Sequence, residues 1–340
     1  MWRKIGKAIG IFVGWCVIVA YLAFAAHITQ EDRATQKVEK VVVSLPDSSA
    51  QQRFTSSAQI LKLIKRKNIR MKGVQVDSLD AVEIAKTIES DGYVRKADVY
   101  VASNGKLYID VYQHKPVMRM MCGGRDSYIT EEGHIFRSPQ GSSCYTAVMT
   151  GCYRPQFPRN YQGLVGDYYR SRLDKIDEEA EALAKDISML RREQVAYTEK
   201  INESDDDEAK NMYREKLAAL NDREESIKAR QPLVAERRQK LEKRRDDFEN
   251  LLQFVSDVQE DTFWSAEIVQ FVADTTFTGE ISLRLVPRSG NFVVEFGTLN
   301  RKDEKLDKLR GFYDKGLQYM GWDRYKIVDI RYDKQIICTE

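Results

Sequence analysis

The spacing of hydrophobic positions changes several times along the chain, beginning with a continuous apolar run over residues 8–28. As a helix, this run nearly spans the roughly 30 Å hydrocarbon core of a bilayer. Three basic residues precede it and acidic residues follow it, which predicts a cytoplasmic tail at 1–7 and an extracytoplasmic chain beyond the membrane. Residues 29–37 read as a polar stalk. A cleaved signal peptide is the alternative, because Ala23-Phe24-Ala25 fits a small-x-small cleavage site.

Residues 38–116 then predict a small α+β domain. A β-branched strand near 38–43 is followed by a helix that Ser56 or Ser57 could cap and by a second helix over 79–89. Two strands follow, joined at Asn104-Gly105, which is a strong hairpin signal. This order predicts two helices on one face of a three-stranded sheet. The free edge of such a sheet can add a strand from a partner.

A β-rich domain follows, and a helical insert interrupts it. Short strands are predicted within 117–158, whereas residues 159–252 are charged and helical. The insert opens with seam positions that alternate between spacings of three and four, a coiled-coil pattern: Leu173, Ile176, Ala180, Leu183, Ile187, Leu190, Gln194, Tyr197 and Ile201. After a turn near Ser204, the second half resumes with polar seam positions at Glu224, Gln231, Arg238 and Arg245.

We expect these two halves to form an antiparallel hairpin that projects from the β-rich domain. Pro232 predicts a kink or a break in its second helix, since proline removes one backbone hydrogen bond. A spacer or a solvated helix pair without a partner is the alternative to a docking or oligomerisation arm.

The β pattern returns over residues 253–340. Strands are predicted at 266–272, 280–286, 292–296, 325–332 and 335–338, together with an amphipathic helix over 302–319 that Gly321 ends. Segments 117–158 and 253–340 therefore make one β-rich domain. The predicted fold class is α+β, with one N-terminal transmembrane helix, a small α+β domain, and a β-rich domain interrupted by a coiled-coil helical hairpin.

Composition and motifs give no support for catalysis. The chain has 340 residues with 54 Lys+Arg against 52 Asp+Glu, a balance that does not favour nucleic acid as a partner. We find no phosphate-binding loop, nucleophile elbow or His/Cys metal cluster, so no catalytic residue, cofactor or metal ligand is predicted. Four cysteines would face an oxidising compartment as disulfides or as buried thiols, and spacing does not choose among their pairings: Cys122, Cys144, Cys152 and Cys338.

Several stretches outside about 159–251 resemble the bacterial cell-division protein family FtsQ. In order along the chain they are Gly92-Tyr93-Val94-Arg95-Lys96-Ala97-Asp98-Val99-Tyr100, Gly105-Lys106-Leu107, Val111-Tyr112-Gln113-His114-Lys115-Pro116-Val117-Met118-Arg119, Asp126-Ser127-Tyr128-Ile129, Glu132-Gly133, Phe263-Trp264, Leu285-Val286-Pro287-Arg288, Phe296-Gly297, Lys305-Leu306 and Val328-Asp329-Ile330-Arg331-Tyr332-Asp333. His114 stands where that family usually has Arg. The very short tail and the helical insert also depart from the family pattern.

The resemblance implies that 38–116 is a POTRA-type domain and that the protein is a non-catalytic scaffold of the divisome in the inner membrane, enriched at the division site. Such proteins recruit the small bitopic coiled-coil proteins FtsB and FtsL, and their last strands pair edge-on with FtsB. The matching partner-binding positions here are Ile330, Arg331, Tyr332, Asp333 and Lys334. Arg331 could also pair with a partner carboxylate, or Ile330 and Tyr332 could simply be core residues.

Two other functions fit parts of the sequence. A POTRA-type domain also occurs in proteins of outer-membrane protein assembly and secretion, although no barrel-like run of strands follows here. A membrane-anchored interaction protein that uses the helical arm is the second alternative, and the arm's partner is unknown from sequence.

Overall fold

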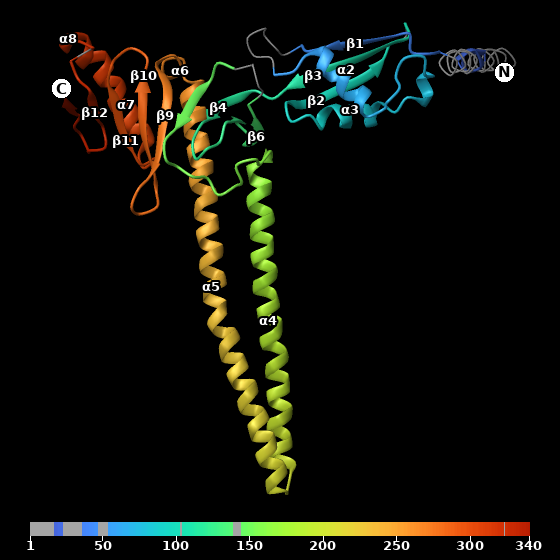
Figure 1. Cartoon of the computed structure of the whole chain (residues 1–340), viewed down its shortest axis with the longest axis vertical. Coiled ribbons are helices and arrows are strands. Elements are labelled where there is room, and N and C mark those ends of the chain that lie inside the picture. Colours follow the sequence, from blue (N-terminus) through green and yellow to red (C-terminus); the bar gives the residue numbers. More distant parts are fainter. Residues whose placement is uncertain (1–16, 23–35, 47–53, 103, 139–143, 323) are drawn as a thin grey trace, which may run out of the picture. The chain divides into compact units, whose positions relative to one another are not determined.

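The computed structural model describes residues 17–22, 36–46, 54–102, 104–138, 144–322 and 324–340 (Figure 1). The chain divides into two compact units. Unit 1 is Met1–His114 with Pro139–Tyr145, and unit 2 is Lys115–Ser138 with Thr146–Glu340. Of the predicted membrane segment 8–28, only the helical residues 17–22 are described. No helix among the described residues is both long and apolar enough to cross a bilayer. The tail at 1–7 and most of the stalk lie outside the described residues.

Unit 1 has the predicted order of strand, helix, helix, strand and strand. Its elements are β1 (Lys40–Ser44), α2 (Ser57–Arg66), a 3-10 turn (Val76–Ser78), α3 (Ala81–Glu89), β2 (Val94–Val101) and β3 (Lys106–Gln113). The central strand β3 pairs parallel with β1 and antiparallel with β2. Ser56 caps α2 by accepting a hydrogen bond from the Gln59 amide at 3.3 Å, as the sequence suggested.

The core of unit 1 lies between the helices and one face of the sheet. Buried and partly exposed positions alternate along β3, so every second side chain faces the helices. These strand residues pack with isoleucines spaced four apart on each helix, one helical turn: Ile60, Ile64, Ile84, Ile88, Leu107, Ile109 and Val111. The two edge strands of this sheet are β1 and β2.

Unit 2 contains a ten-stranded sheet in the order β13-β12-β11-β10-β9-β7-β4-β5-β6-β8. The strands are β4 (Pro116–Met120), β5 (Ser127–Thr130), β6 (His134–Arg137), β7 (Ala147–Thr150), β8 (Gly163–Leu164), β9 (Ile268–Thr275), β10 (Ile281–Pro287), β11 (Val293–Gly297), β12 (Ile327–Asp329) and β13 (Ile337–Thr339). The two halves of the sheet, far apart in sequence, join where β7 pairs parallel with β9. One sheet is therefore built from the chain segments before and after the helical insert.

The insert is a pair of long helices that run side by side (Figure 1). They are α4 (Val165–Glu203) and α5 (Asp207–Glu260), joined by a short turn at which Asp206 caps α5. The apolar seam of this helical arm contains Leu183, Ile187, Leu190, Ile227 and Val234. Most of the predicted seam positions are buried or partly buried, whereas Ala180 and Gln231 are exposed.

Two expectations about the second helix of the arm are corrected. The predicted break at Pro232 is wrong, because α5 continues through it. Ile227 and Val234 lie buried on either side of the proline, and their packing offsets the one missing backbone hydrogen bond. The helix also runs past the expected boundary at 252 to Glu260, and its last turns join the core of unit 2.

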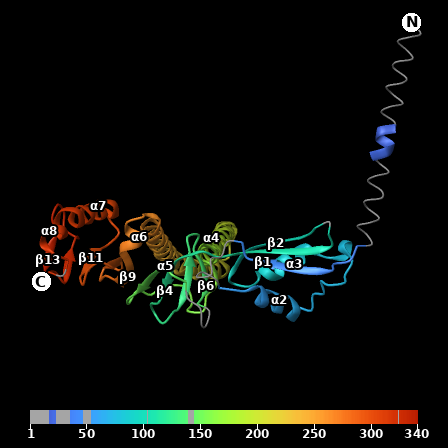
Figure 2. The same cartoon turned by 90° about the horizontal axis from the view of Figure 1, so that it is seen from above.

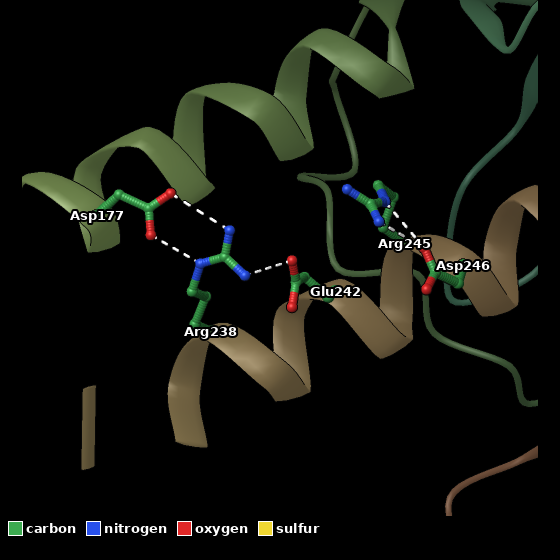
Figure 3. Close-up of polar contacts among 5 residues, drawn as sticks. All are labelled: Asp177, Arg238, Glu242, Arg245 and Asp246. Carbon is green, nitrogen blue, oxygen red and sulfur yellow. Dashed lines mark hydrogen bonds and ion pairs between the residues drawn. The ribbon is translucent and has the colours of Figure 1, made fainter. Parts of the chain in front are cut away.

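Three of the four polar seam positions of α5, Glu224, Arg238 and Arg245, form ion pairs or hydrogen bonds instead of apolar contacts. Arg238 donates from Nε to the Asp177 carboxylate of α4 at 2.7 Å and from Nη1 to Glu242 at 2.5 Å (Figure 3). Closer to the globular core, Arg245 pairs with its neighbour Asp246 at 2.8 Å (Figure 3). Arg238 thus links the two helices, whereas the Arg245 pair stays within α5.

Glu224 has the most extensive polar contacts of the seam. Lys228 lies 2.8 Å from its carboxylate, Gln194 donates to it at 2.8 Å, and Arg191 donates at 3.0 Å. These hydrogen bonds lower the pKa of Glu224 to about 2, and the bond from Lys228 has the largest effect. A glutamate in the unfolded chain titrates near about 4.3, so the folded arm holds this group ionised where the unfolded chain protonates it.

We therefore expect acid to destabilise the arm through Glu224. Its stabilising contribution is complete above about pH 4.3 and is lost as the pH falls towards about 2. The measurement is thermal unfolding of helix by far-ultraviolet circular dichroism as a function of pH. Glu224→Gln should flatten the acid dependence, whereas the exposed neighbour change Glu225→Gln should leave it unaltered. Equal profiles for the two variants would contradict the assignment.

The C-terminal helical segment covers one side of the last strands of unit 2 (Figure 2). It comprises α7 (Lys302–Phe312), a π-helical turn (Tyr313–Leu317) and α8 (Gln318–Met320). Leu309, Tyr313 and Leu317 are buried in the same core cluster as Val294 of β11. Gly321 follows with a φ of 91°, a conformation that suits glycine, so the predicted stop is observed.

Candidate protein-binding site

The five predicted partner-binding residues occupy the turn between the last two strands. Strands were expected over 325–332 and 335–338, but β12 ends at Asp329 and β13 begins at Ile337. Residues 330–334 therefore do not form a strand edge. Lys334 takes a positive φ of 56°, which is typical of a turn.

Ile330 and Arg331, the first two of the five, are held at the start of the turn by contacts with their own chain. Ile330 is fully buried, and its amide donates to the Glu295 carbonyl at 3.1 Å, so it is a core residue. The Arg331 guanidinium donates to both carboxylate oxygens of Asp329, from Nε at 2.9 Å and from Nη2 at 2.6 Å. Burial alone would raise the pKa of Asp329, but the hydrogen bonds from Arg331 lower it. A partner carboxylate would have to share Arg331 with Asp329.

Arg331 is held in place by a glycine of β11. A Cβ built on Gly297 would lie 2.8 Å from the Arg331 Cγ, and Gly297 has a φ of 74°. The aliphatic part of the Arg331 side chain thus packs directly on the backbone of Gly297. This close approach fixes the start of the turn.

The other three predicted residues line a cavity of about 300 Å³ together with one face of α7. Tyr332 is 46% exposed, and its backbone carbonyl accepts a hydrogen bond from Lys308 Nζ. Asp333 pairs with Arg301 at 3.0 Å. The complete lining is Arg301, Glu304, Lys305, Lys308, Tyr332, Asp333 and Lys334.

Positive charge exceeds negative charge in this lining. Four of the seven side chains are basic and two are acidic, and both acids lie within ion-pair distance of Arg301. Burial, followed by the charge of Arg301, lowers the pKa values of Lys305 and Lys308. An acidic side chain entering the cavity would relieve that repulsion, so the cavity favours a negatively charged segment.

The open backbone edge next to this turn belongs to β13. This strand is the end of the sheet order, and it pairs antiparallel with β12 on its inner side. Ile337 is 43% exposed. Edge strands present unpaired backbone groups to which another strand can add. The segment between β12 and β13 includes Tyr332, Asp333 and Lys334, which line the cavity.

Sequence reasoning missed the contribution of α7 to this site. That helix was assigned from its apolar positions, while Arg301, Lys305 and Lys308 follow one another along it at spacings of four and three. This basic spacing was the available signal. Separately, Cys122, Cys152 and Cys338 are free thiols in the structure.

A strand edge and a cation-rich cavity are features through which proteins can bind other polypeptides. The comparisons with known families are consistent with such binding. Residues 36–112 match the POTRA-like domain, and residues 206–339 match the family described as FtsQ/DivIB, C-terminal related. Together the two matches support an FtsQ/DivIB-type cell-division protein. No curated protein matches the sequence.

Both matched families are non-catalytic scaffold domains, and the FtsQ/DivIB family implies localisation at the division site with divisome proteins as partners. The C-terminal match begins at the residue that caps α5. It therefore includes the second helix of the arm, which the sequence resemblance had left out. It does not include β4 to β8, although these strands complete the same sheet.

Proposed function

We propose that the protein is a divisome scaffold of the inner membrane, anchored by residues 8–28, that recruits small bitopic division proteins of the FtsB and FtsL type. The partner would add a strand to β13 and place an acidic side chain in the cavity beside the turn. The observation that carries the proposal is the position of β13 at the end of the sheet, beside a lining with excess positive charge. Both features lie within the family-matched segment.

In this proposal, backbone and side chains contribute differently to binding of the partner. A three-residue strand offers few backbone hydrogen bonds, so it would supply orientation more than affinity. Arg301, Lys305 and Lys308 would supply selectivity for an acidic segment. Tyr332 and Lys334 would contact the partner, while Arg331 and Ile330 would hold the turn.

Photo-crosslinking in growing cells tests the proposal. Probes replace Tyr332 and Ile337 one at a time in the full chain, and a matched probe replaces Tyr319, which is 86% exposed in the same unit. We expect the first two to capture a small single-pass protein and Tyr319 to capture none. Arg331→Glu should abolish capture, because it repels Asp329 and releases the turn.

A second variant separates loss of the site from loss of the fold. Lys334→Glu changes an exposed residue of the cavity lining and should reduce capture without altering thermal unfolding. Capture of an outer-membrane assembly factor would favour the secretion alternative. Equal capture from Tyr319 and Ile337 would refute the C-terminal site.

A further inference from the structure

A second cavity of unit 2 is lined by three arginines from separate segments. It measures about 270 Å³, and Arg125 from the β4–β5 loop, Arg137 from the end of β6 and Arg159 from the segment before α4 line it. Polar side chains complete the lining, including Asn160 and Gln162. It shares no lining residue with the cavity beside β13.

Two adjacent glycines bring two of these guanidinium groups onto one turn. Gly123 and Gly124 have φ values of 61° and 73°. A Cβ on Gly123 would lie 2.9 Å from Nη1 of Arg125, and a Cβ on Gly124 would lie 3.1 Å from Nη1 of Arg159. The absence of side chains thus provides the space for both groups.

The charges of this cavity are not balanced within the chain. Asp126 also lines it, but Arg119 already holds that carboxylate with hydrogen bonds of 2.7 and 2.8 Å. Among the described residues, the side chains of Arg137 and Arg159 form no ion pair or hydrogen bond, although the Arg137 backbone pairs with β5. Burial, with a further contribution from Arg159, lowers the pKa of Arg125.

Arg125 is fixed in an orientation that leaves one donor unused. Its Nη2 donates to the carbonyls of Pro155, at 3.2 Å, and of Phe157, and its guanidinium lies over the Phe157 ring at 5.2 Å. Its Nε is buried and has no partner among the described residues. A buried donor without an acceptor costs free energy, as does holding like charges together.

We propose that this cavity binds a single oxyanion group, a phosphate or a carboxylate, between Arg125, Arg137 and Arg159. Guanidinium groups match both anions through paired N–H donors. The anion would neutralise the repulsion between the arginines. The volume of about 270 Å³ leaves room for such a group together with part of the molecule that carries it. The site is independent of partner recruitment through β13.

The test is thermal unfolding of the full chain in a non-ionic detergent, with inorganic phosphate or acetate titrated against chloride at constant ionic strength. Ligand that binds the folded state raises the melting temperature as its concentration rises. We expect a saturable rise with at least one of the two anions. Phosphate alone would assign a phosphate group, acetate alone a carboxylate, and both would assign a site for either.

Matched variants of equal charge complete the experiment. Arg159→Gln removes one guanidinium from the cavity and should weaken binding about tenfold. Arg154→Gln removes an exposed arginine of the same segment that does not line this cavity, and it should bind as the unaltered protein does. No rise above chloride, or equal losses in both variants, would overturn the proposal.

Discussion

Replacing Phe254 with alanine is expected to destabilise unit 2 by about 3–5 kcal/mol. Phe254 lies in the last turns of α5 and has no exposed surface. Its ring centroid is 4.9 Å from that of Phe296 on β11 and 6.1 Å from that of Phe271 on β9. Alanine would leave a cavity where the helix meets the sheet, and close-packed surroundings relax only partly around such a cavity.

The measurement is urea denaturation of the full chain followed by tryptophan fluorescence, since Trp264 and Trp322 both belong to unit 2. The matched control is Leu233→Ala on the same helix, where the side chain is 59% exposed. That variant should change the free energy of unfolding by no more than about 0.5 kcal/mol. Similar losses in both variants would show that Phe254 is not the anchor.

The second large effect is expected at Gly151, where a single methyl group cannot be accommodated. Gly151 follows β7 with a φ of 105°, and a Cβ there would lie 2.3 Å from the Ala273 carbonyl oxygen. Tyr153 donates its amide to that same carbonyl at 2.9 Å. Gly151→Ala would therefore strain the backbone and disturb the region where β7 pairs with β9, at a cost of at least about 3 kcal/mol.

Gly166 offers a matched control for that change. It lies in the first turn of α4, and a Cβ there would meet nothing within 4 Å. Gly166→Ala should therefore stabilise the protein by up to about 1 kcal/mol, because alanine favours the helix. Chemical denaturation of both variants measures the difference. If Gly151→Ala unfolds at the same denaturant concentration as Gly166→Ala, the close approach to Ala273 is wrong.

Local patterns predicted unit 1 well because each of its elements carries its own signal. The caps, the two isoleucine pairs and the Asn104-Gly105 turn are all set by neighbours within a few residues. The seam of α4 was predicted for the same reason. Pro232 was misjudged because intrinsic propensity omits the packing of Ile227 and Val234 against the other helix.

The sheet of unit 2 and the candidate site could not be predicted to the same extent. Pairing between β7 and β9 joins residues more than a hundred positions apart, and no local pattern encodes it. Residues 330–332 were placed at the end of a strand over 325–332, whereas the structure has a turn there, with the Asp329–Arg331 pair and the close approach of Arg331 to Gly297. The basic spacing of α7 was visible in the sequence, but the place of α7 in the site depends on that turn.

The continuity of α5 has a mechanical consequence. The helix runs without interruption from the turn at the end of the arm to Phe254 in the sheet core, a length of roughly 70 Å at 1.5 Å per residue. The arm is therefore a lever whose short end is embedded beside β9 and β11. A molecule that pulled on the far end would apply torque to the same strands that lead to β12 and β13.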